Sequence, residues 1–389
     1  MVAVFPFRRK VLAWTTAVFA LAGLAACDVT LPGTSGPLIN TSRAVPVALL
    51  VPKSSQSAGG LAQSLENAAW LAVNDLGDVE VDLMVYDTGG TPDGAARAAN
   101  QAVADGARIF LGPLFAENAR AVGQVAAGRG INVLSFSNNP SIAGGNVFLL
   151  GNTFESSADR LVSFAANRGR GNIFIIHADD PAEQLGAEAI RRAAQRSGAR
   201  VAGTASFPLS QQGVVNAIPA ISREFRTSGA QSVFVTSGTA GALPFLAELL
   251  PENGINNENA QFIGLQRLDV PSSALSLSGL QGAWFATPSP ALVQQFNNRY
   301  AAAYGMPPNP VAGLAYDGVA AIGALVSQGN ANALTVGALT QSAGFAGVNG
   351  AFRLRPDGTN ERGLAVAQIQ NNQVIVIDPA PRSFGGAGF

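Results

Sequence analysis

Short apolar, β-branched runs alternate with longer amphipathic segments along most of this 389-residue chain, and this alternation limits the fold more than any other feature. The run VPVALLVP at 45–52 precedes a segment in which Leu61, Leu65, Ala69 and Leu76 recur at helical spacing. Strands that are apolar along their whole length, each followed by a helix, are typical of parallel sheets covered on both faces. We therefore expect an α/β fold.

The alternation forms two series, the second of which begins near residue 151. The carboxyl-terminal part differs in character, because Asp357-Gly358 and Asn371-Asn372 separate strand-like runs, which predicts antiparallel hairpins. Two helices, at 290–304 and 311–328, follow the second series with no strand between them. Strands are expected at 45–52, 81–88, 108–112, 131–136, 172–177, 200–207, 231–237, 261–265 and 282–287.

The amino terminus is typical of an export signal. A basic segment, Arg8 to Lys10, precedes an apolar stretch at 11–26 that is too short to span a bilayer comfortably. The stretch ends in Leu-Ala-Ala followed by Cys27, the only cysteine, and this looks like a bacterial lipobox. We expect a signal peptide at 1–26 and a lipid on Cys27; the alternative is a buried thiol in a hydrophobic anchor.

Both ends of the exported chain are expected to be loosely structured. Residues 27–43 combine the lipidated cysteine with a segment rich in Pro, Gly, Ser and Thr, which is typical of a flexible tether. Residues 379–389 are interpreted as a loose tail for the same reason. With its cysteine lipidated, the exported chain has no disulfides, so its stability must come from its core.

Charge and size exclude some classes of function. Removal of residues 1–26 leaves 21 basic and 25 acidic residues, a net charge of −4, and leaves Lys53 as the only lysine. Nucleic-acid binders need a concentrated basic face, so no nucleic acid partner is expected. With a single lysine, no polybasic membrane patch is expected either, and the membrane contact is expected through the lipid alone. The length and the 48% hydrophobic content fit two domains.

No residue pattern supports catalysis or metal binding. His177 is the only histidine, and it has no second histidine or spare cysteine to share a metal ion or to form a hydrolase dyad. The glycine pairs in GRGINV and GRGNIF precede strands and lack the third glycine of a dinucleotide site. We expect no catalytic residue, no metal and no cofactor.

Polar residues recur where the expected strands of the first series end. Ligands of open parallel sheets bind beyond the carboxyl ends of the strands, where loops and helix amino termini converge. Single serines and asparagines at such places are usually turn or cap residues, but their recurrence at successive strands favours a cleft. These residues lie in PKSSQSAGG at 52–60, GPLFAEN at 112–118 and SFSNN at 135–139.

The chain resembles the type I periplasmic-binding-protein fold from about residue 44 to 378. The resemblance rests on VALLVPKSSQSAGGLAQSLENAAWLAVND, IFLGPLFAENARAV, INVLSFSNNP and AGLAYDGVAAIGAL. It implies two lobes, each with a mainly parallel sheet flanked by helices, and a carboxyl-terminal β-hairpin region. The implied crossings lie near 151, 285 and 345, which gives lobe 1 as 44–150 with 286–344 and lobe 2 as 151–285 with 345–378.

Within that superfamily the chain is similar to the penicillin-binding protein activator lipoproteins. The segments GAWFATPSPALVQQFNNRYAAAYGMPPNPVAGLAYDG and GVNGAFRLRPDGTNERGLAVAQIQNNQVIVIDPAP carry this likeness. It implies a non-catalytic, periplasm-facing lipoprotein that activates a bifunctional peptidoglycan synthase by direct contact. The alternative is a solute-binding receptor of an ABC-type transporter for a small polar ligand such as an amino acid. Asp28 leaves inner and outer membrane both open.

Two departures from the relatives bear on these expectations. The enteric activator carries an additional amino-terminal helical-repeat domain, whereas this chain has a short tether there. Amino-acid-binding relatives place small hydroxyl residues where this chain has Ala116, which has no hydroxyl, and Glu117, which would oppose a substrate carboxylate. The residues expected to line a cleft are Ser54, Ser55, Ser57, Glu117, Asn138, Asn139 and Asp317.

Overall fold

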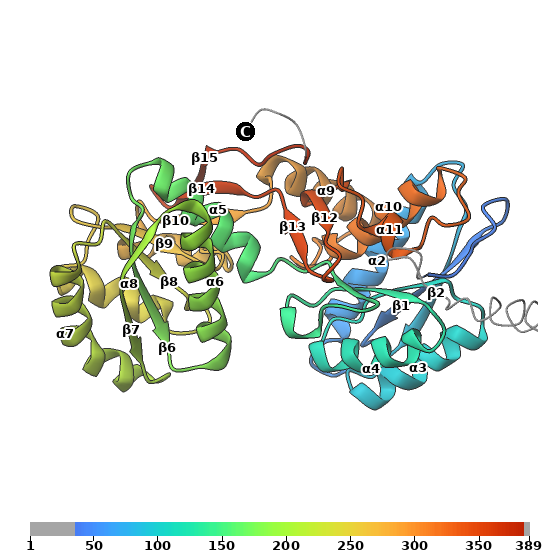
Figure 1. Ribbon diagram of the computed structural model, residues 1–389, viewed down its shortest axis with the longest axis horizontal. Coiled ribbons are helices and arrows are strands. Elements are labelled where there is room, and N and C mark those ends of the chain that lie inside the picture. The colour runs from blue at the N-terminus through green and yellow to red at the C-terminus, as the bar shows by residue number, and fades with distance from the viewer. Residues whose placement is uncertain (1–35, 385–389) are drawn as a thin grey trace, which may run out of the picture.

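The computed structural model describes residues 36–384 as two lobes that lie side by side (Figure 1). Lobe 1 contains a fully parallel sheet in the order β2-β1-β3-β4-β5, and lobe 2 a seven-stranded sheet in the order β15-β14-β10-β9-β8-β6-β7. This confirms the predicted α/β fold of two lobes, each a mainly parallel sheet flanked by helices. The predictions for the signal peptide and for Cys27 lie outside the described residues.

In lobe 1, the alternating side chains of β1 enter two different cores. Val47 and Leu49 pack with one helical pair, α2 and α10, while Ala48 and Leu50 pack with α3 and α4 on the other face. The lobe 1 strands are β1 (Val45–Val51), β2 (Val81–Asp87), β3 (Ile109–Leu111), β4 (Asn132–Ser135) and β5 (Val147–Leu149). Its helices are α2 (Gly59–Asp75), α3 (Pro92–Ala104), α4 (Ala116–Ala127), η2 (Pro140–Ile142), α9 (Pro290–Tyr304), α10 (Gly313–Val326) and α11 (Val336–Leu339).

Lobe 2 repeats this design around β6. Ile173 and Ile175 pack with α5 and α6, whereas Phe174 and Ile176 face α7 and α8. The strands are β6 (Asn172–Ala178), β7 (Arg200–Phe207), β8 (Ser232–Val235), β9 (Gln261–Gly264), β10 (Trp284–Thr287), β14 (Ala365–Gln370) and β15 (Gln373–Asp378). The helices are α5 (Phe154–Asn167), α6 (Pro181–Ser197), α7 (Gln211–Ser228), α8 (Leu243–Glu252), η3 (Ser272–Ser276) and η4 (Ser278–Leu280).

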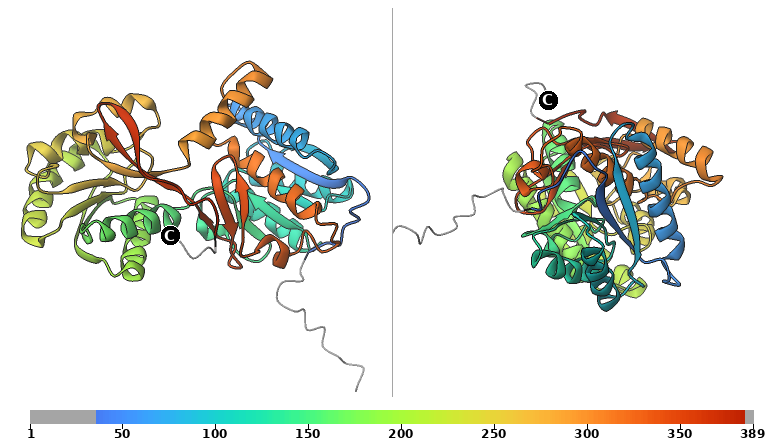
Figure 2. Two further views of the ribbon diagram at one scale, coloured as in Figure 1. Left: turned by 90° about the horizontal axis from the view of Figure 1, so that it is seen from above. Right: turned by 90° about the vertical axis from the view of Figure 1, so that its right-hand side faces the viewer.

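The predicted hairpins are present, and their turns have the expected chemistry. Asn371 and Asn372 both adopt positive φ, 51° and 61°, as a two-residue hairpin between β14 and β15 requires. Asp357-Gly358 lies in the turn between β12 (Gly350–Leu354) and β13 (Asn360–Arg362), which form a small antiparallel sheet with β11 (Phe345–Gly347). Seen from above, the β14–β15 hairpin continues lobe 2 while the small sheet stays with lobe 1 (Figure 2).

The third crossing differs from the sequence expectation. Phe345, Phe352 and Leu354 are buried in the lobe 1 core with α2 and α10, so residues 345–362 pack with lobe 1 instead of lobe 2. The chain passes between the lobes at 150–153, at 288–289 and only then at 363–364. The reason is that the small sheet packs its apolar face against α10. Without this contact, the apolar face of the sheet would be exposed to water.

Both segments that were expected to be loose are partly packed. The N–H of Ile39 donates to the Ala331 carbonyl (3.0 Å), and the Ile39 side chain is buried in the lobe 1 core. At the other end, Pro379 to Phe384, here called the C-terminal strap, runs from lobe 2 onto lobe 1. Arg160 of α5 donates to the Pro379 carbonyl, and the Arg353 guanidinium lies 4.9 Å from the centre of the Phe384 ring. The segments predicted as tether and tail therefore include residues that pack on the lobes.

Candidate functional site

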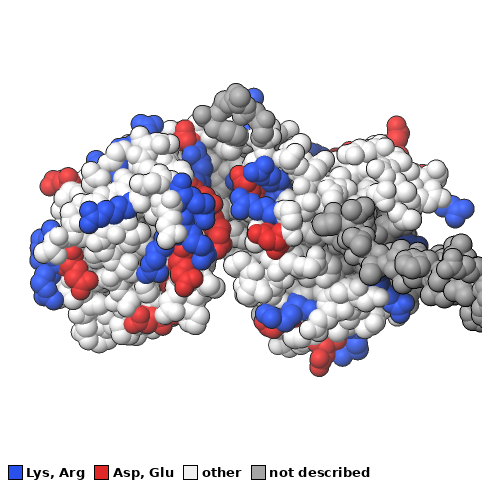
Figure 3. Space-filling view, viewed as in Figure 1, with Lys and Arg blue, Asp and Glu red and all other residues white. Residues whose placement is uncertain are grey.

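The carboxyl ends of both parallel sheets face the junction between the lobes. The chain leaves lobe 1 directly after β5 and leaves lobe 2 directly after β10, so these strand ends lie at the junction. All parallel strands of one sheet end at the same edge, so the loops after β1 to β4 and after β6 to β9 share that position. Figure 3 shows the junction as a notch between the lobes. We call these two edges and the space between them the cleft.

The first three strand-end loops of lobe 1 come together at the cleft. Gly90 has a φ of 75°. A Cβ added to Gly90 would lie 3.3 Å from the Ser55 Cβ and 3.7 Å from the Phe115 ring. A Cβ added to Gly89 would lie 3.7 Å from the Ser54 hydroxyl oxygen. The Ser55 and Ser57 hydroxyls are 3.5 Å apart. The predicted serines are therefore grouped, next to an aromatic ring that is 39% exposed.

Asp87 holds this group of loops in place. Its carboxylate accepts hydrogen bonds from the N–H groups of Gly89 (2.8 Å) and Ser54 (3.2 Å), which joins the loops after β1 and β2. Burial alone would raise the pKa of Asp87, but the hydrogen bonds from Ser54, Gly89 and Lys53 outweigh it and lower the pKa below its ordinary value. The carboxylate therefore stays ionised and keeps the loops together at neutral pH.

Two helices begin at the cleft without a side-chain cap. Ala58 precedes α2 and Phe115 precedes α4, and neither side chain accepts a hydrogen bond from the first turn. The first N–H groups of each helix lack intrahelical acceptors and carry the positive end of the helix dipole. By contrast, Thr91 caps α3 and Thr153 caps α5. The uncapped starts can hydrogen-bond an anionic ligand group.

Asn118 adds an unused donor to the start of α4. The residue is 2% exposed, and its Nδ2 finds no acceptor among the described residues. A buried amide donor without a partner is costly, unless a water molecule or a ligand supplies the acceptor. The preceding residue, Glu117, points outward instead: its side chain is 67% exposed and its carboxylate lies 3.4 Å from Arg120. Glu117 thus lies at the cleft edge but is partly neutralised.

Asn138 and Asn139 lie after β4 and have different roles. Asn139 accepts a hydrogen bond from the Ser141 N–H (3.0 Å) and so caps η2, which is the structural use of such a residue. Asn138 is exposed, and its backbone packs closely against Gly151, where the chain crosses to lobe 2. Of the two asparagines, only Asn138 presents a side chain that no described group engages.

Asp317 is not a cleft ligand, contrary to the prediction. The residue is 0% exposed, and its carboxylate is taken up by Arg362 Nη1 (3.1 Å), the Val348 N–H (2.7 Å) and Asn349 Nδ2 (3.2 Å). Burial raises the pKa of Asp317, and these donors oppose that rise. Arg362 also donates to the Leu150 carbonyl (2.9 Å), so Asp317 anchors the first and third crossings.

The lobe 2 edge contains a buried carboxylate that is already satisfied. Glu183, in the first turn of α6, accepts hydrogen bonds from the Ala178 N–H (2.7 Å), Thr236 (3.0 Å) and Ser237 (2.8 Å). His177 is buried as well, with Nδ1 2.9 Å from the Ala178 carbonyl. These groups join the ends of β6 and β8 to α6, and their contacts leave them little capacity for a ligand.

Charged residues gather where α5 and α6 face the small sheet of lobe 1 (Figure 3). A pocket of about 370 Å³ lies there between the lobes, with the C-terminal strap on its rim. Glu361 pairs with Arg353 (2.7 Å) and Arg355 (3.0 Å), and Arg160 pairs with Asp378 at the end of β15. Because its walls belong to both lobes, the shape of this pocket depends on their relative position.

Neither a cluster of metal ligands nor a membrane-spanning helix occurs within residues 36–384. That part of the chain contains no group of three or more His, Cys, Asp or Glu side chains that could hold a metal ion. It also contains no helix of the length and apolar character needed to cross a bilayer.

Sequence reasoning did not single out Phe115, Asn118 or the two uncapped helix starts. The signal was present: Ala58 and Phe115 stand where Ser, Thr, Asp or Asn usually cap a helix. A missing cap beside a serine-rich loop was the available indication of exposed N–H groups.

Solved structures of binding proteins share this architecture. A branched-chain amino acid ABC transporter periplasmic ligand-binding protein from Burkholderia xenovorans LB400 matches with 20% identity and a TM-score of 0.69, covering 87% of this chain and 96% of its own. An ABC transporter substrate-binding protein from Desulfitobacterium hafniense in complex with Leu matches with 17% identity and a TM-score of 0.63, covering 86% and 100%. A solute-binding protein from Rhodopseudomonas palustris BisB5, in complex with 3,4-dihydroxybenzoic acid, matches with 16% identity and a TM-score of 0.59, covering 88% and 98%.

At these identities the likeness shows the fold. A search of curated protein sequences finds no match. The model of the periplasmic binding protein family, however, matches residues 44–373, which include both lobes and the cleft between them. The chain belongs to the periplasmic binding protein family.

Proposed function

We propose that this protein is a substrate-binding component of an ABC-type transporter and binds a small carboxylate with an apolar body in the cleft. The observation that carries the proposal is the uncapped start of α4, with the unpartnered Asn118 amide beneath it and the exposed Phe115 ring beside it. The N–H groups and the amide suit a carboxylate, and the ring suits an apolar or aromatic body. Membership of the family implies a periplasmic, cell-envelope location.

The bound molecules named for the similar structures, Leu and 3,4-dihydroxybenzoic acid, both combine a carboxylate with an apolar part. Ser54 and Ser55 supply hydroxyls at the same edge for further polar groups of the ligand. The acidic Glu117 opposes a carboxylate less than the sequence suggested, because Arg120 and solvent both weaken its field.

The test is a calorimetric titration of the purified protein with leucine, benzoate and 3,4-dihydroxybenzoate, each beside its uncharged amide. Binding of at least one acid, with its amide at least about tenfold weaker, is the expected result. Phe115→Ala is expected to weaken that binding about tenfold, whereas Met306→Ala, a change of another exposed apolar side chain, leaves it unchanged. Equal binding of acid and amide would reject the carboxylate site.

Activation of a peptidoglycan synthase, and a lipid on Cys27, stay predictions from the sequence. The substrate-binding proteins among the similar structures fit a transport receptor better than an activator. Capture from detergent-solubilised membranes separates them, because a receptor recovers transporter subunits and an activator recovers a bifunctional penicillin-binding protein. Mass spectrometry of the amino-terminal peptide tests the lipid, with Cys27→Ser as the control.

A further inference from the structure

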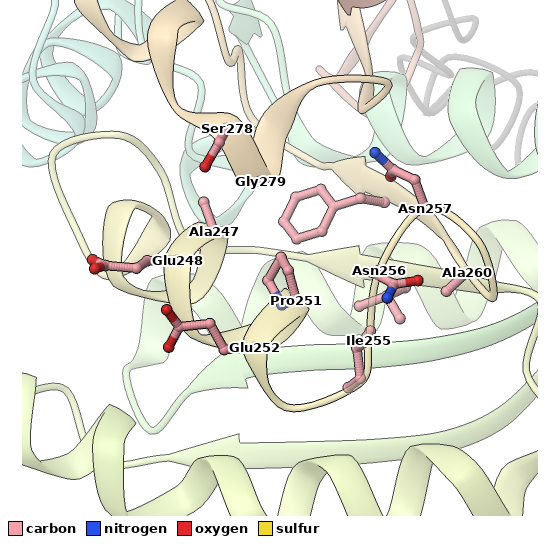
Figure 4. A pocket seen from close by; sticks show the side chains of 12 residues that line it. Ala247, Glu248, Pro251, Glu252, Ile255, Asn256, Asn257, Ala260, Ser278 and Gly279 are labelled. Atoms are coloured by element: carbon pink, nitrogen blue, oxygen red, sulfur yellow. The ribbon is translucent and has the colours of Figure 1, made fainter.

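A second pocket, of about 390 Å³, lies in lobe 2 between α8 and the 3-10 turns before β10 (Figure 4). Val233 and Phe262 line it from the second positions of β8 and β9, so it opens at the starts of these strands, the edge opposite to the cleft. A smaller pocket of about 260 Å³ continues it and shares Ala247, Glu248, Ser278 and Gly279. We call the two together the α8 groove.

The last turns of α8 depart from three local rules of helix structure. Pro251 has no N–H, so the Ala247 carbonyl lacks its usual helical donor. Glu248 and Glu252 are like charges four residues apart, which destabilises a helix. Both carboxylates also lie toward the carboxyl end of α8, where the helix dipole disfavours negative charge. Figure 4 shows the two carboxylates on one side of the pocket and Asn256 and Asn257 on the other.

Nothing in the described chain compensates for this negative charge. Glu248 and Glu252 form no ion pair or hydrogen bond within residues 36–384, whereas Glu155, Asp159 and Glu361 are all paired. No Lys, Arg or His lines either pocket. The Arg226 side chain lies beside the adjacent turn, because its Nη1 is 3.8 Å from the position that a Cβ added to Gly254 would take. Arg226 does not line the groove.

The walls of the groove include a set of apolar side chains. Val233, Ile255 and Phe262 form buried walls, and Phe245 is exposed in the smaller pocket. Gly279 packs directly against the Ala247 carbonyl, since a Cβ added to Gly279 would overlap the carbonyl oxygen. Departures from local rules that serve no packing purpose are expected at functional sites. Here they concentrate negative charge beside the apolar walls of the groove.

We propose that the α8 groove is a binding site for a small organic cation, a molecule with an ammonium group on an apolar body. The body lies over the buried side chains of Val233, Ile255 and Phe262, next to the exposed Phe245, and the ammonium lies against Glu248 and Glu252. The size of the groove lies in the range of small-molecule sites. The site is separate from the cleft, so either proposal can fail while the other stands.

The test uses fluorine NMR with three probes that share a 4-fluorophenyl body: 2-(4-fluorophenyl)ethylammonium, 2-(4-fluorophenyl)ethanol and 3-(4-fluorophenyl)propanoate. The ammonium is expected to bind at least about tenfold more tightly than the alcohol, and the propanoate not to bind in the groove. Amide signals of Ala247 and Asn257 should shift with the ammonium, while those of Ser55 and Asn118 should not.

Glu248→Gln combined with Glu252→Gln should weaken ammonium binding about tenfold or more. Both side chains are exposed, so this variant should keep the fold. The matched control is Glu258→Gln, which removes an exposed carboxylate that does not line the groove and should leave binding within twofold. The proposal is overturned if ammonium and alcohol bind equally, if the double variant binds like the wild type, or if only cleft signals shift.

Discussion

The guanidinium of Arg362 lies 3.1 Å from the carboxylate of Asp317, and both side chains are almost completely buried where the chain crosses between the lobes. Asp317 belongs to α10 and Arg362 to the end of β13, so the pair joins lobe 1 to the segment that enters lobe 2. The relative position of the lobes therefore depends on a buried ion pair.

Asp317→Ala should destabilise the protein by about 3–5 kcal/mol, because it leaves the Arg362 guanidinium buried without its carboxylate. Urea unfolding followed by circular dichroism measures the loss. Asp159→Ala is the matched control: it breaks a largely exposed pair with Arg196 and should cost no more than about 1 kcal/mol. Equal losses in the two variants would contradict the assigned role.

Glu117→Gln should strengthen binding of a carboxylate in the cleft about two- to fivefold, since it removes a negative charge beside the start of α4. Isothermal titration with whichever acid binds the wild type gives the ratio, and the gain should shrink as salt is added. Glu80→Gln, which removes an exposed carboxylate before β2 at the opposite edge, should have no such effect. A weaker complex of the Glu117 variant would place the ligand carboxylate elsewhere.

Glu361 should contribute stability that depends on pH. Burial alone would raise the pKa of its carboxyl, but hydrogen bonds from Arg353 and Arg355 outweigh burial and lower the pKa below 4.5. A lowered pKa in the folded state means that the stabilisation is present above the ordinary pKa and is lost as pH falls through the folded value.

Stability curves of the wild type and of Glu361→Gln are therefore expected to converge between about pH 5 and pH 3, measured as free energies of unfolding in urea. Glu258→Gln, at an exposed carboxylate without an ion pair in the described chain, is the comparison and should change the free energy of unfolding by no more than about 0.5 kcal/mol. A constant gap for the Glu361 variant would show that its ion pairs do not contribute.

Arg160→Ala should loosen the C-terminal strap. The side chain donates to the Leu364 carbonyl (2.7 Å), to the Asp378 carboxylate and to the Pro379 carbonyl, so its loss should cost about 1–3 kcal/mol. Limited proteolysis should cut the strap faster in this variant than in the wild type. Arg223→Ala, at an exposed arginine of α7, is the comparison and should change neither quantity. An unchanged cleavage rate would mean that Arg160 does not hold the strap.

Local pattern predicted most of the parallel sheets because their strands are apolar runs bounded by helices. The exception is β5, Val147–Leu149, which is three residues long and too short for a period to be detected. The third crossing was misplaced for a different reason. Phe345 and Phe352 indicate burial but not the lobe in which they are buried, and only the packing on α10 decides that.

The site was predicted in part. Ser54, Ser55 and Ser57 follow a strand, and strand ends at one edge are close in space, so their grouping could be foreseen. Asp317 could not be assigned, because α10 is apolar on almost every side and its only charged residue could face either the cleft or the core. The answer depended on Arg362, 45 residues later and on another element.

The late position of the small sheet in the chain has a consequence for biosynthesis. A ribosome delivers β1 to β5 first, yet Phe352 and Leu354, which complete the core around them, emerge about 200 residues after β5. Lobe 2 is completed later still, because Val366, Ala367 and Ile369 of β14 belong to its core. Neither core can thus be completed until nearly the whole chain has emerged, and the strands of lobe 1, which are synthesised first, stay incompletely covered for the longest time and most need a chaperone.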